Sequence, residues 1–272
     1  MTSQRAVVSI GIAGALGPDA GGVIAAAAER AGFHGLWVND TPGGDSLELL
    51  AAAAAATTTL VLATGVIPVD RRPAESIAAA VDRLALPEER LVLGIGSGAA
   101  RRGALAMMGD AVRQLADGTG ARVLVGALGP KMRRLAAEEA DGALLSWLTP
   151  ERAAEQADAV RDAAAPRTGY VALYARTAVD PAAIGARDDE ARRYATYPAY
   201  AANFARLGMD PLDTVLPASG DDDIAPGVAA YARSVDELVL RAITATGSVD
   251  EHLEFIEVAR QSLITGGTTL AD

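Results

Sequence analysis

Short runs rich in β-branched residues alternate with alanine-rich stretches along most of the chain, and this alternation constrains the fold most strongly. The expected strands are Val7–Ile12, Gly35–Asn39, Leu60–Val66, Leu91–Gly96, Arg122–Ala127, Gly142–Trp147, Tyr170–Ala175 and Leu238–Ile243. The expected helices are Asp19–Ala31, Ser46–Ala56, Ala74–Leu86, Ala100–Ala116, Lys131–Ala140, Glu151–Ala164 and Val249–Arg260. Alternating strands and helices form a parallel sheet, and about eight such units close a (β/α)8 barrel. We therefore predict an α/β fold, a (β/α)8 TIM barrel, with residues 1–272 as a single domain.

One interval, residues 176–236, breaks the alternation. It holds an Arg-, Asp- and Tyr-rich helical stretch, Asp188–Leu207, and then a polar loop, Pro217–Pro226. Because this extended excursion follows the seventh strand, we expect it over the C-terminal mouth of the barrel, where such folds place active sites. Two interpretations stay open: a substrate lid, or a surface excursion in which Asp221–Asp223 form a solvated turn.

The composition excludes several partners and chemistries. The 272 residues include 24 basic and 35 acidic ones, a net charge of −11, which argues against nucleic acid or an anionic membrane as partner. With no cysteine, the chain has no thiol nucleophile, Cys-ligated zinc or iron–sulfur cluster. No stretch reaches the roughly 20 apolar residues of a membrane span. We expect a cytoplasmic protein that acts on a small molecule.

Other barrel chemistries lack the side chains that they require. Lys131, the single lysine, lies at a helix start and not on a strand, which disfavours Schiff-base catalysis. His34 precedes the second strand and His252 lies in the last helix, so neither supplies a metal ligand at the mouth, and we predict no metal. Asp40 is a well-placed carboxylate, but a glycosidase needs two. The remaining source of chemistry is a bound organic cofactor.

Two helices are expected to begin with basic residues, against the helix dipole. Glycines in Gly94–Gly98 and Gly126–Gly129 precede them and let the backbone approach a ligand. The basic residues are Arg101 and Arg102 in the first helix and Lys131, Arg133 and Arg134 in the second, with Arg71 and Arg72 as additions from the third strand. This arrangement favours an anion site at the two loops. Surface ion pairs and ordinary tight turns are the alternative interpretation.

Several segments, in this order and spacing, resemble the luciferase-like monooxygenase superfamily. They read AGFHGLWVND at residues 31–40, TTLVLATGVI at 58–67 with a following Arg72-Pro73, RLVLGIGSG at 90–98, and Leu128-Gly129-Pro130 leading into Ala140-Asp141-Gly142. The last strand, within Val235–Thr244, also looks like that of the family. The branch that the chain is most similar to comprises actinobacterial oxidoreductases that use coenzyme F420, a deazaflavin.

The resemblance implies a bacterial luciferase-like barrel with the cofactor ring in its mouth and a non-proline cis peptide at Gly65–Val66 supporting one face of the ring. It places Asp40 at the polar side of the ring, and the loops after the fourth and fifth strands at the phosphate. Together with the basic residues, the candidate cofactor-binding residues are Asp40, Gly65, Val66, Gly96, Ser97, Gly98, Arg101, Ala127, Leu128, Gly129 and Lys131. Relatives are often dimers, so we expect a homodimer.

The catalytic residues stay open. Relatives that act on sugar phosphates carry His and Glu where this chain has Thr41 and Ala99, so that chemistry is not expected here. The catalytic candidates are Asp40, Thr41, Tyr174 and Tyr197, and the candidate substrate contacts are Trp147, Arg176 and Tyr200. The helical spacing of the tyrosines at 194, 197 and 200 equally fits a packing stripe.

The number of basic residues favours F420 over FMN as the cofactor. FMN has one phosphate, whereas F420 ends in a phosphodiester and a string of glutamates, and the chain offers more cations than one phosphate needs. We expect an F420-dependent oxidoreductase that transfers a hydride between the deazaflavin and a small organic substrate. The alternatives are an FMN-dependent luciferase-like monooxygenase and a non-catalytic flavin- or deazaflavin-binding barrel.

Overall fold

The structure, a computed structural model, describes residues 6–41, 43–218, 220–268 and 270. Its strands β1, β2, β3, β5, β6, β7, β8 and β10 are all parallel, and β10 pairs with both β1 and β8, which closes the barrel. Their bounds are β1 (Val7–Ala13), β2 (Gly35–Asn39), β3 (Val61–Thr64), β5 (Leu91–Gly96), β6 (Arg122–Gly126), β7 (Gly142–Ser146), β8 (Tyr170–Thr177) and β10 (Glu237–Ala242). The predicted (β/α)8 TIM barrel is confirmed.

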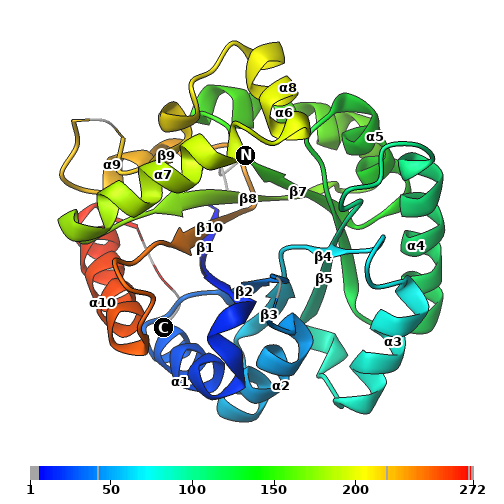
Figure 1. Cartoon of the computed structure of the whole chain (residues 1–272), viewed down its shortest axis with the longest axis horizontal. Coiled ribbons are helices and arrows are strands. Elements are labelled where there is room, and N and C mark those ends of the chain that lie inside the picture. Colours follow the sequence, from blue (N-terminus) through cyan, green and yellow to red (C-terminus); the bar gives the residue numbers. More distant parts are fainter. Residues whose placement is uncertain (1–5, 42, 219, 269, 271–272) are drawn as a thin grey trace.

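Helices form a ring around the strands (Figure 1). They are α1 (Gly17–Arg30), α2 (Ser46–Ala56), α3 (Ala74–Arg83), α4 (Ala104–Gly118), α5 (Pro130–Glu139), α6 (Pro150–Ala164) and α10 (Val249–Thr265). Polar side chains fix several helix starts: Asp45 accepts backbone N–H bonds at α2, Thr149 at α6 and Ser248 at α10. The main apolar core lies between this ring and the barrel.

Side chains fill the interior of the barrel. Trp37 of β2 and Tyr174 of β8 meet edge to face, with ring centroids 5.8 Å apart. Small residues of the same cluster, Ala63 and Ala172, leave room for these two large rings. The interior of the barrel is therefore filled, and a ligand can bind only at the ends of its strands.

A buried carboxylate joins the first strands to the last ones. Glu237 of β10 accepts hydrogen bonds from Ser9 Oγ at 2.5 Å, Trp37 Nε1 at 2.6 Å and Tyr170 Oη at 2.8 Å. These donors come from β1, β2 and β8, and they offset the cost of burying the charge. Burial and the charge of Glu237 raise the pKa of Tyr170, so its hydroxyl keeps its proton and remains a donor.

The third strand differs from the prediction. It was expected to run over Leu60–Val66, but β3 ends at Thr64 and the Gly65–Val66 peptide is cis, as the resemblance implied. The chain then returns to the sheet as β4 (Ile67–Pro68), which pairs with β5. The interruption displaces residues 65 and 66 from regular strand pairing at the C-terminal end of the barrel.

The excursion after β8 also differs from the prediction. The expected helical stretch Asp188–Leu207 is two helices, α7 (Ile184–Tyr194) and α8 (Pro198–Leu207). Pro198 explains the division, because proline has no N–H to continue a helix but is well suited to begin one. In Figure 1 both helices lie over the same part of the barrel rim, above β8.

Two short elements in the excursion escaped sequence analysis. They are β9 (Val215–Leu216), which pairs with β8, and α9 (Ala225–Tyr231). The polar loop expected at Pro217–Pro226 separates them, and Ser219 within it lies outside the described residues. Asp223 accepts a bond from Ala225 N at 3.0 Å and one from Ser262 Oγ of α10, so this part of the loop is anchored beside α10.

Within the described ranges, no helix combines the length and apolarity needed to cross a membrane. The same residues contain no group of three or more His, Asp or Glu side chains arranged to hold a metal ion.

Replacing Glu237 by Ala is expected to lower the free energy of unfolding by at least about 3 kcal/mol, because three buried donors lose their acceptor. Urea unfolding followed by circular dichroism measures the change. Glu257→Ala, on the exposed side of α10, is the control and should alter stability little. Equal stability of the two variants would contradict the role given to Glu237.

Candidate active site

A cavity of about 410 Å³ opens at the C-terminal ends of the barrel strands. Its walls come from the segments after β2, β3, β5 and β6, from the ends of β7 and β8, and from α7 and α8. The candidate residues that line it are Asp40, Thr41, Gly65, Val66, Gly96, Ser97, Gly98, Ala127, Leu128, Gly129, Tyr174, Arg176 and Tyr200. The candidates that do not line it are Arg101, Lys131, Trp147 and Tyr197. Most of the candidates therefore share one cavity.

The expected basic start of the helix after β6 is present. α5 begins at Pro130, and its first turn carries Lys131, Arg133 and Arg134 but no acidic residue. Lys131 and Arg134 are exposed, and Arg134 lies 3.3 Å from Glu138 in an ion pair along the helix. Arg133 is the half-buried member of the three, and it does not itself line the cavity.

A second arginine, which sequence analysis missed, joins Arg133. Arg133 Nη1 donates to the Leu128 carbonyl at 2.9 Å, and Arg206 Nη2 of α8 donates to the same oxygen at 3.1 Å. Burial and the nearby charge of Arg206 lower the pKa of the Arg133 guanidinium. Neither arginine forms an ion pair with a described carboxylate. Two adjacent cations beside a helix N-terminus are suited to bind an anion.

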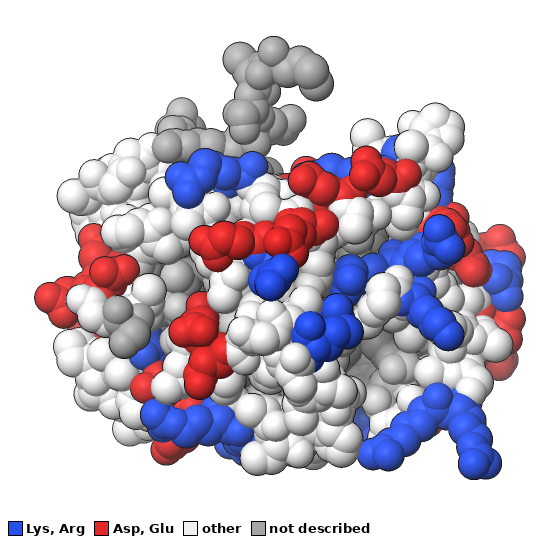
Figure 2. Space-filling view, turned by 90° about the horizontal axis from the view of Figure 1, so that it is seen from above, with Lys and Arg blue, Asp and Glu red and all other residues white. Residues whose placement is uncertain are grey.

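Figure 2 looks at the molecule from the top of Figure 1, where α8 lies. It shows Lys and Arg side chains gathered around a hollow on this side. In a protein with a net charge of −11, this gathering concentrates positive potential at one place on the surface.

The expected basic start of the helix after β5 is wrong. α4 begins at Ala104, so Arg101 and Arg102 are exposed residues of the preceding loop and not of the first turn. Gly103, in the left-handed region at φ +70°, separates them from the helix. The helix dipole argument therefore applies to α5 and not to α4.

The loop after β5 is instead fixed by an acidic residue. Asp70 accepts a hydrogen bond from Ala99 N at 2.8 Å. Gly98 has φ +60°, and a Cβ there would lie 1.8 Å from the Asp70 carboxylate, so the position requires glycine. The Ser97–Gly98 backbone is thereby held against the cavity.

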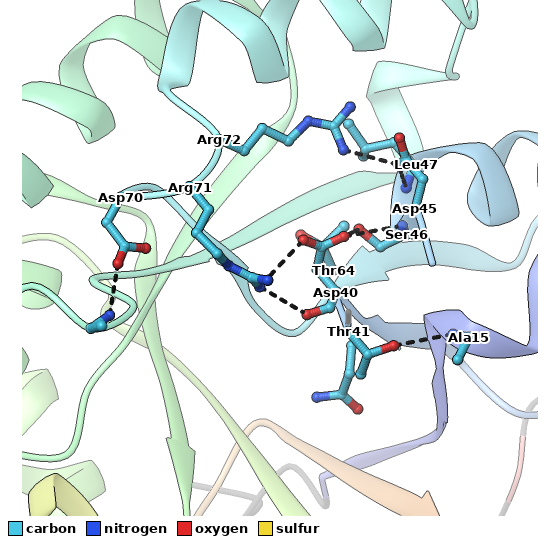
Figure 3. Close-up of polar contacts among 12 residues, drawn as sticks. Ala15, Asp40, Thr41, Asp45, Ser46, Leu47, Thr64, Asp70, Arg71 and Arg72 are labelled. Carbon is cyan, nitrogen blue, oxygen red and sulfur yellow. Dashed lines mark hydrogen bonds and ion pairs between the residues drawn. The ribbon is translucent and has the colours of Figure 1, made fainter. Parts of the chain in front are cut away.

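Asp40 is held in one orientation at the cavity edge (Figure 3). Its Oδ1 accepts from Ser46 N at 3.3 Å and Ser46 Oγ at 3.1 Å, and Arg71 Nη2 lies 3.9 Å from its Oδ2. The side chain is 14% exposed. Thr41, the next candidate, accepts a bond from Ala15 N at 3.1 Å through Oγ1, which ties the loop to the segment after β1.

Arg71 and Arg72 are paired with acidic residues. Arg71 lies beside Asp40, and Arg72 Nη1 is 2.9 Å from Asp45 Oδ1 (Figure 3). Burial alone would raise the pKa of Asp45, but the bond and charge of Arg72 hold it below its ordinary value. Both arginines thus have acidic partners within the chain, and their addition to the anion site stays a prediction.

The opposite end of the cavity holds a buried arginine. Arg176 of β8 is 5% exposed. Its guanidinium lies over the rings of Trp147 at 3.8 Å and Tyr194 at 4.9 Å. Its Nε donates to Glu190 at 3.1 Å and its Nη1 donates to Ser146 Oγ at 2.6 Å. Trp147, buried beneath Arg176 with φ +58°, supports it without lining the cavity.

Glu190 of α7 links the excursion to the barrel. Burial alone would raise its pKa, but the charges of Arg176 and Arg241 hold that pKa below its ordinary value of 4.5. Arg241 Nε donates to Asn39 Oδ1 at 3.0 Å, and Asn39 Nδ2 donates to the Gly65 carbonyl. A polar chain thus runs from α7 to the interruption after β3.

The tyrosines differ in their access to the cavity. The Tyr174 hydroxyl is enclosed beside Gly65 and has no hydrogen-bond partner in the described part of the chain, and burial raises its pKa. Tyr197 is exposed and lies outside the cavity, packed against Tyr194 at 5.4 Å. Tyr200 lines the cavity and packs on Tyr194 at 4.9 Å. Tyr200 is therefore the candidate hydroxyl that a ligand can reach.

Comparisons with known proteins agree with this architecture. A model of the luciferase-like monooxygenase family matches residues 13–117 and 109–266. A search of curated proteins gave no match.

Solved structures share the fold over nearly their whole length. The coenzyme F420-dependent tetrahydromethanopterin reductase from Methanopyrus kandleri has a TM-score of 0.69 and 16% identity, covering 96% of this chain and 99% of that one. An F420-dependent secondary alcohol dehydrogenase has a TM-score of 0.67 and 16% identity, with coverages of 94% and 99%. The oxygenating constituent of 3,6-diketocamphane monooxygenase from Pseudomonas putida, in complex with FMN, has a TM-score of 0.68 and 15% identity, with coverages of 97% and 99%. At these identities, the likeness shows the fold alone.

Replacing Glu190 by Gln is expected to lower the free energy of unfolding by about 1–3 kcal/mol at neutral pH, because two buried arginines lose their carboxylate. The pKa of Glu190 is depressed on folding, so its contribution is present above the ordinary value of 4.5 and is lost as the pH falls through the lower folded value. The difference between wild type and variant should therefore shrink on acidification.

Urea unfolding at a series of pH values measures this difference. Asp189→Asn, on the exposed side of the same helix, is the matched control and should show a small effect. A difference for Glu190→Gln that stays constant as the pH falls would refute the ion-pair explanation.

Proposed function

The chain belongs to the luciferase-like monooxygenase family, and we propose that it is an F420-dependent oxidoreductase that transfers a hydride between the deazaflavin and a small organic substrate. The observation that carries this proposal is that an uncompensated pair of arginines, Arg133 and Arg206, binds the carbonyl of Leu128 in the wall of a cavity that five glycines also line. The cavity offers room for a flat ring, and Arg133 with Arg206 offers charge for a phosphate.

The residues present fit a ring in the cavity. Glycines at 65, 96, 98, 126 and 129 line it, so no side chain projects from these positions into the space. Gly65 and Val66 would support one face of the ring, and Asp40 with Ser97 would meet its polar edges and side chain. Backbone that lies close to the cavity can donate hydrogen bonds without the steric limits of a side chain.

The charges fit a cofactor with more than one anionic group. Arg133, Arg206 and the N-terminus of α5 would hold the phosphate beside Leu128 and Gly129. The exposed cations on the neighbouring loops would attract the glutamate tail by long-range charge. These cations are Arg101, Arg102 and Lys131.

When bound, F420 supplies a ring carbon that accepts or donates a hydride, and the substrate gains or loses a proton in the same overall reaction. The protein orients the reactants and excludes water. The helices α7 and α8 would act as the lid. Tyr200 would contact the substrate as a hydrogen-bond donor, because burial raises its pKa and keeps it protonated. Asp40 and Thr41 would orient the ring, and Tyr174 would support Gly65 from the barrel side.

A second candidate function is an FMN-dependent monooxygenase. It is favoured by the likeness to the diketocamphane monooxygenase constituent, whose structure contains FMN. The basic residues beyond Arg133 and Arg206 support F420 over FMN, whose single phosphate needs fewer cations. A non-catalytic deazaflavin-binding barrel is the third candidate function. Turnover of enones or imines by the protein would exclude it. The cytoplasmic location and the homodimer stay predictions.

Titration of the purified protein with F420 and with FMN, followed by cofactor fluorescence, tests the proposal. F420 is expected to bind at least about tenfold more tightly than FMN, because one additional charge-assisted contact accounts for a difference of about that size. Tight binding of FMN together with no binding of F420 would overturn the choice of cofactor.

The replacements Arg133→Gln and Arg206→Gln should each weaken F420 binding by about tenfold or more, because each removes a charged donor from the phosphate. Added salt should reduce the difference in F420 affinity between the wild type and these variants, since screening weakens the same charge interactions. Arg134→Gln, which removes an exposed charge paired with Glu138 on the same helix, is the control and should have a small effect. Unchanged affinity in both test variants would exclude this anion site.

A further inference from the structure

We propose that the substrate is an organic acid and that Arg176 binds its carboxylate. This inference rests on the proposed function, because it takes the end of the cavity at β8 to be the substrate end. It concerns the substrate and not the cofactor, whose anionic groups would lie beside Arg133 and Arg206.

Arg176 has an unused donor. Its Nε is bonded to Glu190 and its Nη1 to Ser146 Oγ, whereas its Nη2 contacts no polar atom of the described residues. The residue is 95% buried and lines the cavity. Nη2 is not one of the fully enclosed side-chain nitrogens that lack a partner, so it is accessible from the cavity and can donate to a ligand there.

The surroundings of Arg176 are positively charged. Glu190 lies 3.1 Å from Arg176 Nε and 3.6 Å from Arg193 Nη2, and its charge also acts on Arg241. Within the described part of the chain, these three arginines share Glu190 as their acidic partner. Asp40, the acidic residue that lines the cavity, is beside Arg71. One carboxylate does not compensate three guanidinium groups, so an anion is favoured here over a neutral ligand.

A second donor completes the site. Tyr200 lines the same cavity, and its ring packs at 4.9 Å on Tyr194, over which Arg176 also lies at 4.9 Å. Its hydroxyl has no hydrogen-bond partner among the described residues, and burial raises its pKa, so it is a donor. A carboxylate has two oxygens and would accept from Arg176 Nη2 and from Tyr200 Oη. A neutral amide offers one oxygen and no charge.

Matched acid and amide pairs test the proposal. Crotonate is compared with crotonamide, and cinnamate with cinnamamide, by calorimetric titration into the protein saturated with F420 and into the cofactor-free protein. At least one acid should bind at least about tenfold more tightly than its amide, which corresponds to about 1.4 kcal/mol. Equal affinities within each pair, or no binding of either acid, would overturn the proposal.

Variants identify the residue responsible. Arg176→Gln should remove the preference for the acid and change amide affinity by less than about twofold, and Tyr200→Phe should reduce the preference without abolishing it. Arg192→Gln, an exposed arginine of α7 paired with Asp189, is the control and should keep the wild-type preference. Retention of the full preference in Arg176→Gln would contradict the assignment. If that variant does not fold, as judged by circular dichroism, the titrations of the wild-type protein and of Tyr200→Phe with the acid and amide pairs still test the proposal.

The design separates this inference from the choice of cofactor. F420 binding is measured by fluorescence in the same samples. A preference for acids in a protein that does not bind F420 would uphold the carboxylate site and reject the cofactor. Binding of F420 without a preference for acids would support the choice of cofactor and reject the carboxylate site at Arg176.

Discussion

The closure of the barrel around the buried Glu237 carboxylate is the constraint on which the rest of the structure depends. Its three donors lie on β1, β2 and β8, so the carboxylate joins the start of the chain to its last strands where the sheet must close. Closure brings the C-terminal ends of all eight strands to one mouth. It is why Asn39 and Arg241, 202 positions apart, share a hydrogen bond there.

Charge is distributed at this mouth in two separate places. Arg133 and Arg206 donate to the carbonyl of Leu128 in the cavity wall and have no carboxylate partners among the described residues. Arg176 lines the cavity from β8 and shares Glu190 with two more arginines. The cavity wall also includes the glycines at 65, 96, 98, 126 and 129. Such an arrangement suits a long ligand with an uncharged flat centre and an anionic tail, with room for a second anion beside Arg176. The acidic surface elsewhere confines this preference to the mouth.

Much of the fold was predictable because its signal is local. The strands are buried along most of their length and each helix buries one face, so the alternation of apolar runs predicted the eight units. The resemblance to the family, and not this alternation, placed Asp40, Gly65 and Val66 at the mouth. The wrong prediction at Arg101 arose because an apolar pattern does not fix a helix start, which here depends on the backbone of Gly103. Arg206 was missed because it lies 78 positions from Leu128, in the last turn of α8, where a basic residue is ordinary. Nothing in the sequence distinguishes Glu190 from the other charged residues around it. Its burial results from the packing of α7 on β8.

The central claim is that the mouth of the barrel holds the deazaflavin with its phosphate between α5 and α8. A crystal structure of the protein in complex with F420 tests it most directly. We expect electron density for the ring against Gly65 and Val66, and for the phosphate beside Arg133 and Arg206. Density for the phosphate elsewhere, for example beside the exposed Arg101 and Arg102, would contradict it.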